Sequence, residues 1–258
     1  MKRFIFLCIY GASIFLSSCS SYKKIPYFQD LDPGKTLSES TENYTPLLIK
    51  PNDVLGINVT SRNPESSAVF NYNLSHVSGS PVVSEDNPVI GYLVDEEGNI
   101  HLPYLGAIKV AGFTTLQVRD MLNTKLQALY KDPVVNIRLI NFKVAIYGDV
   151  ERPNLYTLQN EHTTITQALS LAGDLNITAK RNNVLLIRHE NGKRKFIRVD
   201  LTSKKIFDSP YYYLQNNDEI YVTPDRTKYA EVDRGYRNTS LLLSALSIIA
   251  LVITNVNR

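Results

Sequence analysis

The sequence predicts an α+β protein: two small mixed domains, followed by a C-terminal transmembrane helix. Two successive blocks, residues 46–141 and 142–224, each combine strand-like alternation with one segment of helical apolar spacing. Separate apolar stretches stand near both ends of the chain. Of the 258 residues, 43% are hydrophobic and 21% are charged, and the formal net charge is +3. This composition excludes a disordered chain and a strongly basic nucleic-acid binder.

The N-terminal segment has the pattern of an export signal. Lys2 and Arg3 precede an almost unbroken apolar run, Phe4 to Leu16. The run is too short for a good membrane span, and it is typical of a secretory signal. The following Leu-Ser-Ser-Cys resembles a bacterial lipobox, in which the cysteine is lipidated and becomes the first mature residue. We therefore predict a lipoprotein signal peptide at 1–18 and lipidation at Cys19; an ordinary signal peptide with an incidental cysteine is the alternative.

Residues 19–45 are polar and contain Pro26, Pro33 and Gly34, which predicts a lipid-anchored tether. Its aromatic cluster, residues 25–28, either docks on the folded part of the chain or is incidental.

The first block, 46–141, contains six stretches expected as strands and one helix. The expected strands are 47–49, 54–60, 89–94, 100–102, 106–110 and 134–140, the first of them leading into a turn. Thr114 or Thr115 caps a helix that runs to Tyr130, where Lys131-Asp132-Pro133 stops it. Residues 62–87 are expected to form a loop.

The second block, 142–224, predicts a further α+β module. The expected strands are 144–150, 184–188, 196–199 and 218–223. Thr163 caps a helix that ends at Gly173, and Asn191-Gly192 favours a hairpin turn. Residues 225–238 are expected to be a linker.

The C-terminal stretch 239–258 is predicted as a transmembrane helix. Its 20 positions would span about 30 Å, and no charge interrupts Leu241 to Val256. The hydroxyl residues Ser240, Ser244, Ser247 and Thr254 fall on one helical face. Three interpretations remain: a tail anchor, a buried core helix, or several copies packed into an oligomeric ring whose pore these four residues line.

Several motifs resemble the bacterial outer-membrane polysaccharide export lipoprotein family. Ile49 to Leu55, Asp95 to Pro103, Gly112-Phe113-Thr114 and Tyr130 to Val135 are similar to its polysaccharide export domain. Residues 147–150, 152–153, 164–168 and 172–173 are similar to the soluble-ligand-binding β-grasp (SLBB) module that follows it. This chain has Asn52, Asn154 and Asp174 at positions where the family usually has glycine.

The resemblance implies an outer-membrane lipoprotein with its body in the periplasm and its C-terminus outside. It implies a homo-oligomer, an octameric ring, that passes capsular polysaccharide or exopolysaccharide to the cell surface in a porin-like manner. The implied partners are that polysaccharide, membrane lipid and an inner-membrane polysaccharide co-polymerase linked to a tyrosine kinase. A monomeric periplasmic glycan-binding or scaffold lipoprotein is the alternative.

Catalytic patterns are missing from the sequence. The four histidines, His76, His101, His162 and His189, lack metal-ligand spacing, and there is no nucleophile elbow or phosphate-binding loop. Asp95-Glu96-Glu97 reads as a solvated turn. We expect no enzymatic activity, cofactor, metal or nucleic-acid partner.

Two groups are candidates for polysaccharide contact. The cationic side chains Arg188, Lys193, Arg194 and Lys195 surround the predicted hairpin and would attract an acidic polymer, unless they are solvated or paired. The aromatic side chains Tyr211 and Tyr212 would stack on sugars or on a neighbouring subunit, unless they pack within the fold.

Overall fold

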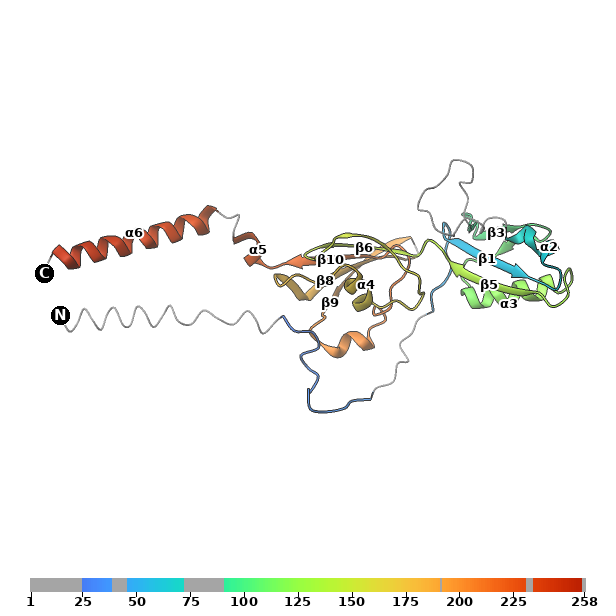
Figure 1. Ribbon diagram of the computed structural model, residues 1–258, viewed down its shortest axis with the longest axis horizontal. Helices are drawn as coiled ribbons and strands as arrows, with labels where there is room; N and C mark the ends of the chain where they lie inside the picture. Colours follow the sequence, from blue (N-terminus) through green and yellow to red (C-terminus); the bar gives the residue numbers. More distant parts are fainter. Residues whose placement is uncertain (1–24, 39–45, 72–90, 191, 231–233, 257–258) are drawn as a thin grey trace.

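The computed structural model describes residues 25–38, 46–71, 91–190, 192–230 and 234–256 (Figure 1). The lipidation site predicted at Cys19 lies outside the described residues. Within them the chain is α+β, with three sheets and several helices, as the sequence predicted.

The first body is built on a three-stranded antiparallel sheet. Its order is β2 (Tyr92–Leu93), β1 (Val54–Thr60), β5 (Val134–Leu139). Leu55, Ile57 and Val59 point into the core from β1, because alternate side chains of a strand face the same side. A short hairpin, β3 (Asn99–Leu102) and β4 (Gly106–Lys109), lies beside this sheet.

Helix α3 (Thr115–Leu126) packs on β5 through Val118, Leu122 and Leu126. Thr114 caps it, and the side chain of Gln117 returns the bond to the backbone of Thr114. The helix ends four residues before Tyr130, where it was expected to stop. The ring of Tyr130 instead packs edge-on against Phe70, at 5.9 Å between centroids. The stretch predicted as loop contains two short helices, α2 (Pro64–Ser67) and η2 (Ala68–Phe70).

The second body is a five-stranded sheet in the order β7-β6-β10-β8-β9. The strands are β6 (Lys143–Gly148), β7 (Asn154–Thr157), β8 (Ala179–Glu190), β9 (Lys193–Val199) and β10 (Glu219–Pro224). β10 runs parallel to β6, and the other pairs are antiparallel. Helices α4 (Ile165–Leu171) and η4 (Lys204–Asp208) lie on one side of this sheet (Figure 1).

Several boundaries of the second body differ from the sequence expectation. Thr164 caps α4, whereas Thr163 donates its hydroxyl to the carbonyl oxygen of Asn160 at 2.7 Å. β8 is much longer than the predicted strand 184–188. The hairpin was predicted correctly: Glu190 pairs with Lys193, and Gly192 has a φ of +70°.

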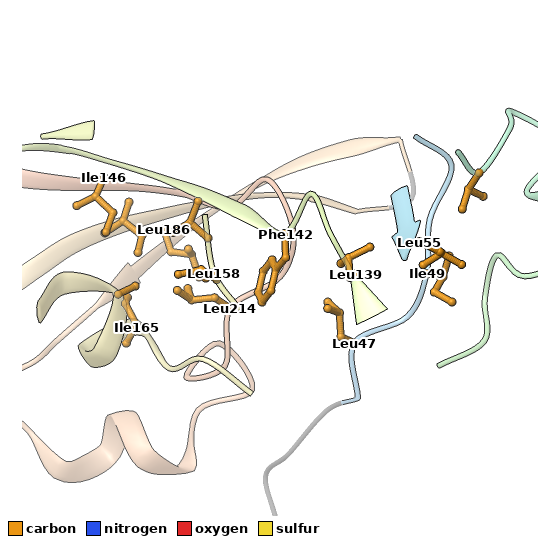
Figure 2. Packing of buried hydrophobic residues seen from close by; sticks show 14 of the residues in the cluster. Leu47, Ile49, Leu55, Leu139, Phe142, Ile146, Leu158, Ile165, Leu186 and Leu214 are labelled. Carbon is orange, nitrogen blue, oxygen red and sulfur yellow. The ribbon is translucent and has the colours of Figure 1, made fainter. Parts of the chain in front are cut away.

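The apolar core is continuous from one body to the other (Figure 2). Leu139 at the end of β5 and Phe142 before β6 are buried at the junction, near Leu47. Leu47 and Ile49 were expected in a strand. They are buried in non-strand backbone, and Ile49 exchanges backbone hydrogen bonds with Phe113 and Gly112 at 2.9 Å.

The segment after the predicted lipid site docks on the second body. The backbone N–H groups of Phe28 and Gln29 donate to the carbonyls of Leu201 and Thr202. The ring of Phe28 lies 4.8 Å from that of Phe207. Of the two alternatives for the aromatic cluster at 25–28, docking is therefore the one confirmed.

The C-terminal part contains α5 (Arg226–Ala230) and α6 (Arg234–Val256). Within the part of the chain that the structure describes, no helix combines the length and apolarity that a bilayer crossing demands. The transmembrane helix expected over 239–258 is therefore wrong. The continuous apolar stretch Leu241 to Val256 gives only about 24 Å of helix against about 30 Å of hydrocarbon, and serines dilute it.

Gly148 closes the end of β6 where another residue would not fit. Its φ is +100°, and a Cβ added there would lie 2.2 Å from the carbonyl oxygen of Val222 on β10. Gly112 has a similar φ of +87° but open space around it.

We expect Gly148→Ala to lower the free energy of unfolding by at least about twice as much as Gly112→Ala. The shared cost is the left-handed backbone, about 1–2 kcal/mol; only Gly148 adds a clash with backbone. Urea unfolding of both variants measures the difference. Equal losses would show that the approach of β6 to β10 adds no constraint.

Candidate functional site

Arg188, one of the predicted polysaccharide contacts, is buried in the second body. It is 3% exposed, and Asp218 beside it is 1% exposed. Arg188 Nε and Nη2 donate to the carboxylate of Asp218 at 2.9 and 2.6 Å, and Nη2 also donates to the carbonyl of Tyr213 at 2.9 Å. A guanidinium in this position holds the fold and does not reach a polymer at the surface.

The other three cationic residues of the hairpin are exposed on β9, the edge strand of the sheet. Lys195 forms an ion pair with Glu190 on β8. This ion pair lowers the pKa of the Glu190 carboxyl and raises the pKa of the Lys195 ammonium group. Arg194 Nε lies 3.2 Å from His189 Nε2. Lys193 is exposed at the start of the strand. Of the predicted cationic set, these three remain available at the surface.

The two predicted aromatic contacts pack within the second body. The ring of Tyr211 lies 5.5 Å from the guanidinium carbon of Arg188. The ring of Tyr212 contacts Phe207 and Tyr213 edge-on, each at 5.3 Å. Both side chains are partly buried and pack against the core. Their positions therefore agree with the alternative that they pack within the fold.

The four residues predicted to line a pore lie on α6. The hydroxyls of Ser244, Ser247 and Thr254 each donate a hydrogen bond to a backbone carbonyl oxygen of the same helix. The acceptors are the carbonyls of Ser240 at 2.9 Å, Ser244 at 2.8 Å and Ala250 at 3.0 Å, respectively. The predicted pore-lining role required a helix that crosses the membrane. Because no described helix is long and apolar enough to do so, this role is left without its basis.

The junction of the two bodies contains a polar network that the sequence did not reveal. Asp53 is 3% exposed; its carboxylate accepts from the backbone N–H of Lys50 at 2.8 Å and from Asn216 Nδ2 at 2.7 Å. The Oδ1 atom of Asn216 accepts from the N–H of Lys143 at 3.1 Å. The Lys50 ammonium donates to Gln215 at 2.8 Å.

Burial dominates the electrostatics of this junction. It raises the pKa of the Asp53 carboxyl, and it lowers the pKa of the Lys50 ammonium group. The hydrogen bonds from Asn216 to Asp53 and from Lys50 to Gln215 cross from one body to the other. The network is therefore a structural latch between the bodies.

A second buried carboxylate, Asp149, ties α5 to the sheet. It accepts from Asn176 Nδ2 at 3.0 Å, from Thr178 Oγ1 at 2.7 Å and from the ammonium of Lys228 on α5. Burial by itself raises the pKa of Asp149, but these donors outweigh burial and hold it below the usual value. Asp149 thus fixes the point where the chain leaves the second body.

The carboxylates of the Asp95-Glu96-Glu97 turn do not form a catalytic pair. Asp95 accepts from the N–H of Asn99 at 2.7 Å, and its other oxygen lies 3.1 Å from His101 Nε2. These partners lower the pKa of Asp95. Among the residues with described positions, no three His, Cys, Asp or Glu side chains are grouped to hold a metal ion.

Comparison with known proteins agrees with this architecture. Residues 40–140 match the protein family described as polysaccharide biosynthesis/export protein. Over these residues the chain is similar to the polysaccharide export family. The resemblance seen in the motifs of the first block is thereby confirmed.

Two curated relatives of the export family extend the similarity beyond residue 140. One, the EPS I polysaccharide export outer membrane protein EpsA of Ralstonia nicotianae, is 29% identical over 204 residues, or 75% of this chain and 50% of the relative. The protein of the same name from Ralstonia solanacearum is 28% identical over 59% of this chain and 40% of the relative. The chain thus spans about half the length of the relatives it matches.

The signal for the latch was present in the export-domain motif. Pro51-Asn52-Asp53 lies within the stretch that resembles the family signature, but the pattern alone gives Asp53 no role. Its partner, Asn216, lies 163 positions away, and no local pattern connects the two.

We expect Asp149→Asn to destabilise the protein by about 1–3 kcal/mol at pH 7, because the buried site loses its charge opposite Lys228. The folded pKa of Asp149 is lowered, so its contribution is present above the unfolded value of about 3.9 and is lost as the pH falls through the folded pKa. The difference from wild type should narrow below about pH 4 in urea unfolding measured across pH.

Asp132→Asn is the matched control, because Asp132 pairs with Arg62 at an exposed site. Its effect should stay within about 1 kcal/mol. A loss for Asp149→Asn that does not change with pH would contradict the role of the ionised carboxylate.

Proposed function

We propose that this chain is one subunit of an outer-membrane assembly that passes a capsular or extracellular polysaccharide from the periplasm to the cell surface. The observation that carries the proposal is the similarity to two proteins named as outer membrane polysaccharide export proteins. The longer alignment, 204 residues, exceeds the family match at 40–140, so the similarity is not confined to the first body.

In this proposal the chain is anchored by lipid at Cys19, with both bodies in the periplasm. The polymer arrives from an inner-membrane polysaccharide co-polymerase. The subunit contributes shape and surface to transport, while the polymerising machinery supplies the driving force.

The assembly proposed here is a homo-oligomeric ring. Copies arranged around one axis enclose a passage only if each copy keeps its shape. The latch at Asp53 and Asn216 and the continuous core through Phe142 give each copy that rigidity.

The first test is export in cells. Removing the chain should abolish surface polysaccharide, and the wild-type chain should restore it. Cys19→Ser should restore at most about a tenth of it, because the subunit is no longer held at the membrane. Immunodetection of polymer on intact cells, with fractionation of the subunit, measures both effects. Normal surface polymer without the chain would refute the proposed function.

The second test is oligomeric mass. The detergent-extracted, lipidated protein should have a protein mass that is a multiple of one subunit, measured by light scattering with the detergent contribution subtracted. A strictly single-copy protein would favour the alternative, a monomeric periplasmic scaffold lipoprotein.

A further inference from the structure

The two faces of the second body's sheet differ. Side chains facing α4 and η4, such as Ile146 on β6 and Ile220 on β10, are fully buried. On β6 and β10 the alternate side chains point to the opposite face and are only partly covered, whereas Ile187 on β8, on the same face, is buried. In Figure 1 α4 and η4 lie on the same side of this sheet. We call the opposite side the outer face.

Strand register places the outer-face side chains in two adjacent rows. One row runs through Ala145, Glu219, Ile187 and Phe196, and the next through Tyr147, Tyr221, Leu185 and Arg198. Neighbouring strands are about 4.8 Å apart, so the rows form an extended strip across the sheet.

Three of the eight side chains in these two rows are aromatic. The rings of Tyr147 and Tyr221 lie 5.4 Å apart, and Phe196 is 64% exposed on the edge strand. A tyrosine offers an apolar ring face together with a polar hydroxyl. A sugar ring has the complementary make-up, with apolar C–H faces and a rim of hydroxyls. The tyrosine pair on β6 and β10 and Phe196 on β9 therefore offer stacking positions at two places across the sheet for an extended glycan.

The charges along the strip favour an acidic glycan. Arg198 lies in the second row, and Arg194 and Lys143 lie on the same face, two residues before Phe196 and Ala145 on their strands. The strip's own carboxylate, Glu219, already accepts a hydrogen bond from the Tyr147 hydroxyl at 3.0 Å. Asp200, just after β9, accepts from Thr202 at 2.8 and 2.6 Å. The cationic groups therefore outnumber the carboxylates and would attract a polyanion.

We propose that the outer face binds a segment of acidic polysaccharide, with the aromatic rings stacked on sugars and Arg198 paired with a carboxylate of the polymer. This inference rests on the proposed export function and names its substrate class. A second copy of the chain is the alternative occupant, because in the ring proposed above a different face of the neighbouring subunit would cover this one, and the test below separates the two.

The test uses the purified full chain in detergent. Oligogalacturonate serves as an acidic probe and maltohexaose as a neutral one, with binding followed by calorimetry. We expect the acidic probe to bind and the neutral probe to bind at least tenfold more weakly. The variants Phe196→Ala and Arg198→Gln should each weaken acidic binding at least fivefold, and Arg198→Gln should also reduce its salt dependence.

Tyr104→Ala and Arg119→Gln are the matched controls, because both residues are exposed on the first body and should leave binding unchanged. Equal affinity of wild type and the Phe196 and Arg198 variants overturns the proposal, as does equal binding of the two probes. A change of oligomeric mass in Phe196→Ala would overturn it in favour of a subunit contact.

Failure here is separable from failure of the export function. Cells that need the chain for export while both variants bind the acidic probe like wild type refute only the outer-face site. Cells that export without the chain refute the function, whatever the binding result.

Discussion

The ion pair between Arg188 and Asp218 organises the structure where its two bodies meet. Asp218 also accepts from the backbone N–H of Gln215 at 2.8 Å, and Arg188 holds the carbonyl of Tyr213, so the pair fixes the whole loop that precedes β10. The same loop presents Asn216 to Asp53. Removing one member of a buried pair commonly costs about 3–5 kcal/mol. Here the loss would also loosen the contact between the bodies.

The export-domain signature is explained by this arrangement. Asp53 binds the second body, so its role is to set the relation of the two bodies and not to contact polymer. Asn52 stands where the family usually has glycine and adopts a φ of +69°, a left-handed conformation that asparagine tolerates better than most residues. The departure from the family pattern therefore keeps the backbone that the motif needs.

The sequence predicted most of what depends on local pattern. Alternation located β1 and β5, the Asn-Gly pair located the hairpin, and a capping threonine placed each helix start within one residue. It did not reveal long-range pairing: the parallel contact of β10 with β6, the burial of Arg188 by a carboxylate 30 positions away, or the latch. Apolar composition alone also overstated the C-terminal helix, because length and serine content decide whether a helix can cross a bilayer.

The docked N-terminal segment has a geometric consequence. Tyr27 lies against the second body, with its hydroxyl on Asp174 and its ring 5.4 Å from the guanidinium carbon of Arg181. Tyr27 lies eight positions after Cys19, and this stretch of chain, even fully extended, reaches only about 25–30 Å. If Cys19 carries the lipid proposed above, this short connection holds the five-stranded sheet within that distance of the membrane surface.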